Sequence, residues 1–231
     1  MTGKTILYVN SVGGQTDIVY DGSSAAFNSR GEAIALLKSF EEDFQTVDVD
    51  GNETPKKIPE QNKTYNVYRA IKLGLGDFFV KNGFKTACLG LSGGIDSAVV
   101  LSMAAETLGP ENIRVLLMPS QFSSDHSVED ARELAENLGV EYQIVPINET
   151  FAALTATLGP VFGELPFNVA EENMQARIRG MMMMAISNKF GNVLLATSNK
   201  SEIAVGYGTL YGDTVGALSI IGDLYKSEVY D

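Results

Sequence analysis

Six consecutive residues of this chain, Ser92-Gly93-Gly94-Ile95-Asp96-Ser97, combine residue types that bind anions. The apolar residues 86–89 before them are typical of a buried strand, and the apolar residues 98–101 after them are typical of the first turns of a helix. Adjacent glycines let a backbone adopt positive φ and approach a ligand closely. The start of a helix adds unpaired N–H groups and positive partial charge. We therefore predict a phosphate site at this loop, since phosphate commonly occupies such a junction.

This loop is not of the Walker type, because no Gly-Lys-Ser/Thr follows it. It resembles instead the pyrophosphate loop of the ATP pyrophosphatases, enzymes that cleave ATP to AMP and pyrophosphate. The alternative interpretation is a tight strand-to-helix turn in which Ser92 or Asp96 caps the helix.

Composition excludes several classes of protein. Hydrophobic residues make up 45% and charged residues 20% of the 231 residues, as in an ordinary globular protein of one large domain or one domain and a piece of another. No apolar run reaches the ~20 residues that span a bilayer, and the first residues do not resemble a signal peptide. The single cysteine excludes an internal disulfide framework and, with one histidine, disfavours an all-protein zinc site. The net charge of −12 disfavours nucleic-acid or membrane partners, and the cytoplasm is the expected location.

Strands alternate with helices from residue 65 onward. Apolar spacing predicts helices over residues 65–81, 97–108, 125–138, 149–158 and 170–189, and strands over residues 86–91, 113–118, 142–147 and 193–196. This alternation predicts right-handed βαβ units, so the expected fold class is α/β with a doubly wound parallel sheet. Ligands of such sheets bind beyond the carboxyl ends of the strands. The Ser92 loop, residues 119–124 and residues 197–202 follow three of those ends and are expected to converge on one crevice.

The first part of the chain has a different pattern, with short strands and turns in place of alternating strands and helices. Residues 5–9 and 17–20 are typical of short strands, with turn signals at residues 13–15, 21–23 and 29–32. Residues 46–63 are polar, contain glycine and proline, and are typical of a linker. We therefore expect a small β element over residues 1–45, a linker over residues 46–63 and an α/β domain over residues 64–231.

Further motifs narrow the resemblance. They are Glu172-Asn173-Met174-Gln175-Ala176-Arg177-Ile178-Arg179, Thr197-Ser198-Asn199-Lys200-Ser201-Glu202, Gly206-Tyr207-Gly208-Thr209-Leu210-Tyr211-Gly212-Asp213 and Gly222-Asp223-Leu224-Tyr225-Lys226. With the loop they closely resemble NAD synthetase, whose sheet is of the adenine-nucleotide alpha-hydrolase type. The first 30 residues resemble the closing strands of the nitrilase-type glutaminase domain that precedes the synthetase in the glutamine-dependent form of that family.

The resemblance implies that the chain is an internal fragment. The family's glutaminase uses a Glu-Lys-Cys triad, which cannot be placed here, because Cys88 lies in the strand before the loop and is interpreted as a core residue. The family continues past the position of Tyr230 with a segment that carries a substrate-binding lysine. We therefore expect a glutaminase remnant followed by a synthetase domain truncated at its C-terminus, either inactive or active with ammonia alone.

The implied reaction is the amidation of nicotinic acid adenine dinucleotide (deamido-NAD) to NAD. The nicotinate carboxylate attacks the α-phosphate of ATP, giving an acyl-adenylate and pyrophosphate, and ammonia, normally taken from glutamine, then displaces AMP. The residues expected to bind ATP are Gly90, Leu91, Ser92, Gly93, Gly94, Ile95, Asp96, Ser97, Thr197 and Lys226. Those expected to contact deamido-NAD are Asn173, Arg177, Glu202, Tyr207, Gly208, Thr209 and Leu210. The full-length form is expected to be a homo-oligomer.

Two carboxylates, Asp96 and Glu202, are expected to hold Mg²⁺, because a carboxylate cannot bind phosphate directly without repulsion. The resemblance assigns Glu202 to Mg²⁺ or to deamido-NAD without separating the two. For both residues the alternative is a charge at a helix N-terminus. Arg177 lies one turn from Asn173 on the same helical face, whereas Arg179 points elsewhere on a regular helix.

Other interpretations stay open beside these. Lys226 could be a surface lysine, and residues 207–210 a simple packed turn. Met181 to Met184 cover every face of a helical turn, which predicts core packing, and His126 is expected at the surface or as a cap. The alternative functions are a non-catalytic nucleotide-binding or assembly module and another pyrophosphate-loop amidotransferase such as GMP synthetase. The motifs between Asn199 and Asp213 favour NAD synthetase over the latter.

Overall fold

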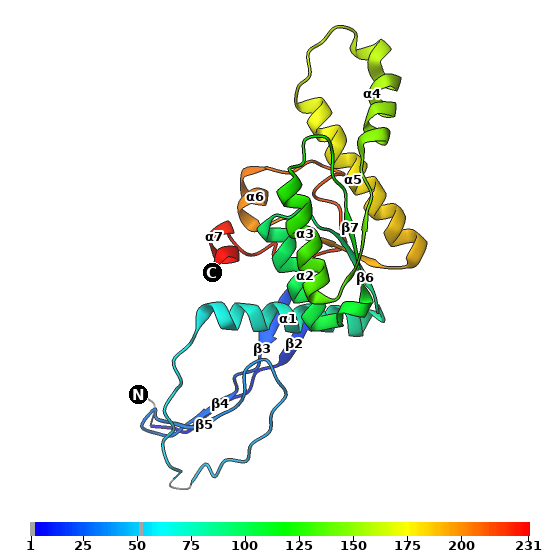
Figure 1. Ribbon diagram of the computed structural model, residues 1–231. Coiled ribbons are helices and arrows are strands. Elements are labelled where there is room, and N and C mark those ends of the chain that lie inside the picture. The colour runs from blue at the N-terminus through cyan, green and yellow to red at the C-terminus, as the bar shows by residue number, and fades with distance from the viewer. Residues whose placement is uncertain (1–2, 51–52) are drawn as a thin grey trace. The chain divides into compact units, whose positions relative to one another are not determined.

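A computed structural model describes residues 3–50 and 53–231 (Figure 1). By its internal contacts the chain divides into two compact units, Met1–Asn82 and Gly83–Asp231. Helix α1 (Lys63–Asn82) belongs to the first unit. The expected boundaries, after residue 45 between the β element and the linker and after residue 63 between the linker and the synthetase domain, stay a prediction. Among the described residues, no helix is both long enough and apolar enough to cross a membrane.

The first unit contains α1 and two small antiparallel sheets. Its strands are β1 (Ile6–Tyr8), β2 (Val12–Gln15), β3 (Ile18–Asp21), β4 (Ala25–Phe27) and β5 (Ala33–Leu36). One sheet has the order β1-β4-β5, and the other is the β2–β3 hairpin, against which α1 packs. Residues 46–50 and 53–62, within the expected linker, form neither helix nor strand.

The expected turn at residues 13–15 is wrong, because these residues form β2 and pair with β3. The glycines serve close packing against α1. A Cβ on Gly13 would lie 2.7 Å from Oδ2 of Asp77, and a Cβ on Gly14 would lie 3.2 Å from Cα of Gly74. Larger side chains would hold the helix away from the hairpin.

The second unit is built on a five-stranded parallel sheet of order β10-β9-β6-β7-β8. Its strands are β6 (Ala87–Gly90), β7 (Ile113–Leu117), β8 (Glu141–Ile144), β9 (Val193–Ala196) and β10 (Leu218–Ser219). Its helices are α2 (Ile95–Leu108), a 3₁₀ turn (Pro110–Asn112), α3 (Asp125–Leu138), α4 (Asn148–Phe162), α5 (Val169–Phe190), α6 (Lys200–Val205) and α7 (Lys226–Tyr230). The α/β fold class with its parallel sheet is confirmed.

Local signals set the ends of these helices. The hydroxyl of Ser124 accepts a hydrogen bond from the backbone N–H of Ser127 and caps α3, which ends at Gly139 in the left-handed conformation. Asn168 and Glu171 form a capping box at the start of α5. Each device satisfies backbone groups that a helix end leaves unpaired.

Successive side chains of β6 point to opposite faces of the sheet. Cys88 is buried in a cluster with Ile178 and Met183 of α5, and α2 and α3 cover the other face (Figure 1). Burial raises the pKa of the Cys88 thiol to about 11, against a small opposing effect of Arg114. Cys88 is therefore a core residue, as predicted.

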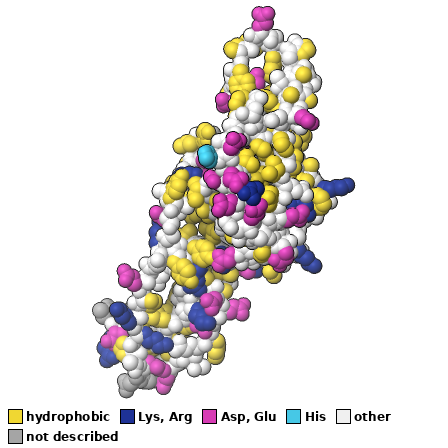
Figure 2. All heavy atoms as spheres, in the orientation of Figure 1, with side chains coloured by type: hydrophobic (Ala, Val, Ile, Leu, Met, Phe, Trp, Pro, Cys, Tyr) yellow, Lys and Arg dark blue, Asp and Glu magenta, His cyan; other side chains and the backbone are white. Residues whose placement is uncertain are grey.

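The expectations for the methionine run of α5 and for His126 have different outcomes. Within the run Met181 to Met184 on α5, Met183 is buried, but Met181 is 60% and Met184 37% exposed, so the prediction of core packing is wrong for these two. The reason is that only one face of α5 lies against the sheet. His126 is exposed, as expected, and Figure 2 shows it in cyan on the molecular surface.

We expect Asp77→Asn to destabilise the first unit by about 1 kcal/mol at pH 7. The carboxylate accepts hydrogen bonds from the backbone N–H of Gly14 at 2.7 Å and from Nζ of Lys81 at 2.8 Å. Burial opposes its charged form, but these bonds outweigh burial and lower the pKa of Asp77. A lowered pKa contributes stability above the unfolded value of about 3.9, and this contribution is lost as pH falls through the folded pKa.

Urea denaturation of both chains at pH 7 and at pH 2 to 3 measures this contribution. The difference between wild type and variant should shrink at the acidic pH. Asp17→Asn, in the exposed turn of the hairpin, is the matched control and should change neither value. A difference of equal size at both pH values would contradict an ionic contribution.

Candidate nucleotide-binding site

The Ser92–Ser97 loop joins β6 to α2, as predicted. Gly93 has φ of +82°, and a Cβ there would lie 2.2 Å from the carbonyl oxygen of Ser127 at the start of α3. Gly94 is the N-cap of α2 and provides no side-chain hydrogen bond to the first turn. The capping alternative is therefore wrong for Ser92 and Asp96, and backbone N–H groups at this helix start are available to a ligand.

Two hydroxyls hold the loop in shape. The buried Ser97 donates from Oγ to the carbonyl oxygen of Gly94 at 3.0 Å and accepts from the backbone N–H of Ser92 at 3.2 Å. Oγ of Ser92 lies 3.1 Å from Oγ of Ser97 and accepts from the N–H of Gly94. Ser97 therefore organises the loop, whereas the exposed Ser92 can face a ligand.

Asp96 brings together three segments that are far apart in sequence. Its Oδ1 accepts a hydrogen bond from Nδ2 of Asn199 at 3.0 Å, and its Oδ2 pairs with Nζ of Lys226. Burial disfavours the charge on Lys226, but the hydrogen bond and charge of Asp96 outweigh it and raise the pKa of Lys226, aided by Tyr230 and Glu202. Lys226 therefore stays protonated beside the loop rather than lying free on the surface.

Asn199 and Glu202 close the start of α6 with a capping box. Oδ1 of Asn199 accepts from the N–H of Glu202 at 3.0 Å, and Oε2 of Glu202 accepts from the N–H of Asn199 at 3.1 Å. Asn199 is fully buried, and its amide serves both this cap and Asp96. Glu202 therefore brings a negative charge to the N-terminus of α6, and its expected contact with Mg²⁺ or deamido-NAD stays a prediction.

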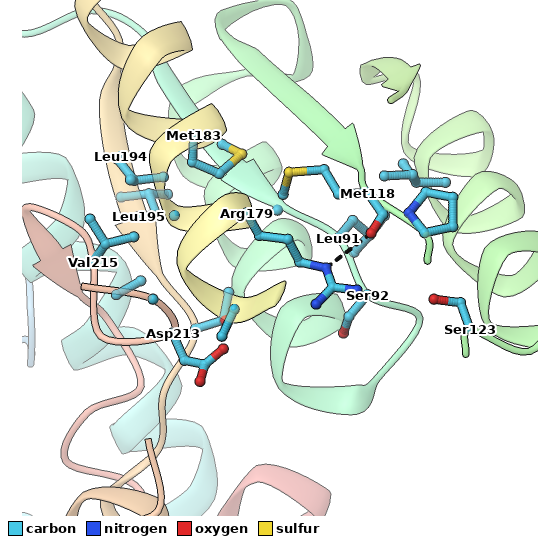
Figure 3. A pocket seen from close by; sticks show the side chains of 18 of the residues that line it. Leu91, Ser92, Met118, Ser123, Arg179, Met183, Leu194, Leu195, Asp213 and Val215 are labelled. Carbon is cyan, nitrogen blue, oxygen red and sulfur yellow. Dashed lines mark hydrogen bonds between the residues drawn. The ribbon is translucent and has the colours of Figure 1, made fainter. Parts of the chain in front are cut away.

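A cavity of about 280 Å³ lies beyond the carboxyl ends of β6, β7 and β9 (Figure 3). The three expected strand ends do converge there, because Gly90, Leu91 and Ser92 line it together with Pro119, Ser123 and Thr197. Its wall is completed by four residues of α5 and three of the loop after α6, namely Ala176, Arg179, Gly180, Met183, Gly212, Asp213 and Val215. Leu117, Met118, Val128 and Leu195 give it apolar surface. Such a mixed cavity suits a nucleotide, whose base is apolar on its faces and whose phosphates are charged.

Arg179 enters this cavity from α5, whereas Arg177, which the spacing from Asn173 favours, does not line it. Its Nε donates to the carbonyl oxygen of Met118 at 3.0 Å, which Figure 3 marks with a dashed line. Burial lowers the pKa of Arg179, and the charge of Asp213 partly opposes this effect. All the residues that line the cavity lie in the described part of the chain, and only Arg179 and Asp213 among them are charged.

Apart from Glu202, which lies on α6, the residues expected to contact deamido-NAD lie on α5 and on the loop after α6. Oγ1 of Thr209 donates to Oδ1 of Asn173 at 2.8 Å, and Nε of Arg177 donates to the carbonyl oxygen of Leu210 at 3.1 Å. The side chains of Tyr207 and Leu210 are 77% and 68% exposed. The loop backbone is packed, but these side chains are available to a ligand, so a simple packed turn is too narrow a description.

The carboxylate of Asp96 fits an Mg²⁺ ion of the kind that is held mainly by phosphates. Among the described residues no group of three or more His, Cys, Asp and Glu side chains gathers as a metal site. Nucleotide-bound Mg²⁺ needs only one or two carboxylates, with water and phosphate oxygens completing its octahedron. Each oxygen of Asp96 accepts one hydrogen bond and keeps a second lone pair.

Comparison with known proteins identifies the family of this site. The model of the family "NAD synthase" matches residues 67–231. The chain belongs to the NAD synthase family. This span includes the loop, the cavity, Asn199 and Lys226.

Individual relatives agree with this membership. The chain is 48% identical to a glutamine-dependent NAD(+) synthetase of Synechocystis sp. in an alignment of 231 residues. This alignment covers 98% of the chain and 41% of the relative. A structure of glutamine-dependent NAD+ synthetase from Acinetobacter baumannii in complex with ADP superposes with a TM-score of 0.91 at 40% identity, over 98% of this chain and 44% of that one. NH3-dependent NAD synthetase from Campylobacter jejuni gives a TM-score of 0.67 at 35% identity, over 74% and 72%. The chain spans less than half the length of the glutamine-dependent relatives.

Sequence reasoning did not select Arg179 and Asn199 as site residues, although each leaves a signal. Asn199-Lys200-Ser201-Glu202 has the spacing of a capping box. Arg179 lies four residues from both Gln175 and Met183, which are buried. Residues at this spacing share one helical face, so Arg179 is a charged residue on a buried face of α5. A charged residue on such a face needs a partner and therefore marks a candidate site.

We expect Gly93→Ala to abolish the stabilisation of this chain by ATP. The left-handed backbone costs a non-glycine residue about 1 kcal/mol, and the contact with the Ser127 carbonyl adds about 1–3 kcal/mol or forces the loop to move. Gly139→Ala is the matched control, because Gly139 also has positive φ, at +69°, but open space around its Cβ. Thermal unfolding with and without MgATP measures both effects. Unchanged ATP stabilisation in Gly93→Ala would contradict a phosphate site at the loop.

Proposed function

We propose that this chain carries the synthetase site for ATP-dependent amidation of deamido-NAD to NAD, a ligase reaction that forms a C–N bond. The observation that carries this proposal is the meeting of Asp96, Asn199 and Lys226 at the uncapped start of α2, beside the cavity. Family membership supports NAD synthesis over GMP synthesis among the pyrophosphate-loop amidotransferases.

In the first step the nicotinate carboxylate of deamido-NAD attacks the α-phosphorus of ATP. The bond to the bridging oxygen of the β-phosphate breaks, and an acyl-adenylate and pyrophosphate result. The N–H groups at the start of α2, the hydroxyl of Ser92 and the ammonium of Lys226 are proposed to bind the departing pyrophosphate. Donors fixed before the reaction stabilise this developing charge without reorganisation.

The carboxylate of Asp96 is proposed to hold Mg²⁺, which when bound neutralises phosphate charge. The carboxylate of Glu202 is proposed to hold the same ion or to contact deamido-NAD. Lys226, whose pKa is raised, brings a further positive charge that does not depend on the ion. Thr197 lines the cavity at the end of β9 and is proposed to donate to ATP from its hydroxyl.

In the second step ammonia attacks the acyl carbon, AMP leaves with its phosphate, and a proton is lost to give the amide. Asn173, Arg177 and residues 207–210 are proposed to orient the dinucleotide, because their contacts fix the loop against α5. Holding the acyl carbon and the phosphate in line removes the entropic cost of bringing them together. In the longer glutamine-dependent protein the ammonia is proposed to come from glutamine.

An oligomer and a cytoplasmic location belong to this proposal as well. The apolar helix α4 has no buried residue, and Val161, Leu165 and Phe167 are 77%, 73% and 54% exposed. An exposed apolar surface of this kind supports association with another copy of the chain.

The experiment is to incubate the chain with MgATP, deamido-NAD and ammonium chloride and to measure NAD, AMP and pyrophosphate. We expect all three products in equal amounts. Nucleotide binding without turnover would contradict the proposal and favour a non-catalytic module.

We expect Asp96→Asn to lower kcat at least about 100-fold while the chain stays folded, because the variant loses the negative charge proposed to hold Mg²⁺. Steady-state kinetics and thermal unfolding measure the two effects. Asp125→Asn, at the exposed first turn of α3, is the matched control and should keep full activity. An Asp96→Asn variant with the full rate would refute the metal role.

A further inference from the structure

Arg179 is a charged residue on the otherwise uncharged face that α5 turns toward the cavity. Ala176, Gly180 and Met183 line the cavity beside it. The guanidinium reaches across the cavity toward Met118 (Figure 3). Arg179 is therefore directed into the site by its own helix rather than toward solvent.

The protein satisfies only part of this guanidinium. Its Nε donates to the Met118 carbonyl oxygen at 3.0 Å, which fixes the plane of the group. No ion pair with Arg179 exists among the described residues, and Asp213 acts on it only through the coulombic field. A carboxylate oxygen of Asp213 already accepts from the N–H of Thr209 at 3.1 Å. A partly buried guanidinium that keeps its Nη donors for the cavity is a site for an anion.

The loop and the cavity determine which anion this is. Lys226 and the start of α2 gather positive charge for two phosphates at the loop. The apolar wall formed by Leu117, Val128 and Leu195 suits the base. In ATP the phosphate between these two parts is the α-phosphate, and Arg179 is the only cation among the residues that line this cavity.

We propose that Arg179 binds the α-phosphate of ATP and keeps it, as the phosphate of the acyl-adenylate and then of AMP, through both steps of the reaction. This inference rests on the proposed function. It divides the charges of the site into two groups. The loop and Lys226 serve the pyrophosphate that leaves first, and Arg179 serves the AMP that leaves second. A planar guanidinium can donate two parallel hydrogen bonds to a phosphate, which the ammonium of a lysine cannot do.

The test compares the binding of three ligands, namely adenosine, AMP and inorganic pyrophosphate, to the wild-type chain and to its variants by titration calorimetry. For Arg179→Gln we expect AMP affinity to fall about 10- to 100-fold, since hydrogen bonds to a charged group are lost. Affinities for adenosine and pyrophosphate should stay within about threefold of wild type. Arg179→Lys should recover part of the AMP affinity, because it keeps the charge without the fork. Lys189→Gln, in the last turn of the same helix, is the matched control and should bind all three ligands as wild type does.

The pattern across the ligands distinguishes the alternatives. An equal loss for adenosine and AMP would mean that Arg179 only supports the cavity wall through Met118, and would overturn the inference. An equal loss for AMP and pyrophosphate would place Arg179 with the loop instead and would also overturn it. A wild-type chain that binds neither AMP nor pyrophosphate would contradict the proposed function itself. Circular dichroism of each variant separates these outcomes from unfolding.

Discussion

The contact between Asp96 and its two partners is the constraint on which the candidate site depends. Asp96 lies in the first turn of α2, Asn199 caps α6 and Lys226 starts α7, so one carboxylate joins segments 103 and 130 residues away in the chain. A partly buried carboxylate must be paired, and removal of Lys226 would leave the charge of Asp96 without compensation. The same pairing holds an ammonium beside the open N-terminus of α2. The interaction that positions the end of the chain thus also supplies the charge that a phosphate requires.

Helix α5 is the second element on which the site depends, because its different faces contact the core, the cavity and the loop of residues 206–213. Ile178 and Met183 belong to the core and pack with Cys88 on one face of the sheet. Arg179 turns into the cavity, while Asn173 and Arg177 hold the loop of residues 206–213 by hydrogen bonds. A Cβ on Gly180 would lie 2.8 Å from the carbonyl oxygen of Tyr211, so the loop can approach α5 this closely only at a glycine. The cavity and the proposed dinucleotide site therefore share one rigid support.

Local reasoning succeeded where a residue type has a single strong preference in its immediate surroundings. The two glycines at residues 93 and 94 follow a strand and precede a helix, and such a junction has few possible conformations. Gly13 and Gly14 have the same composition, yet they lie in a strand, because what they avoid is a clash with α1 more than 60 residues later. Met181 and Met184 are exposed for a related reason, since periodicity does not tell which faces of a helix another element will cover.

The sequence by itself determined the α/β class, the order of the elements, the phosphate loop and the family resemblance, because each depends on patterns within a few residues or on long ordered motifs. It also assembled the correct set of strand ends, since parallel strands necessarily end on the same edge of a sheet. Only the tertiary structure decided that Lys226 pairs with Asp96, that the buried Asn199 donates to Asp96 and that Arg179 enters the cavity. These contacts depend on how far apart the chain places two side chains in space. That distance follows from the packing of whole helices against the sheet and has no signature at either residue alone.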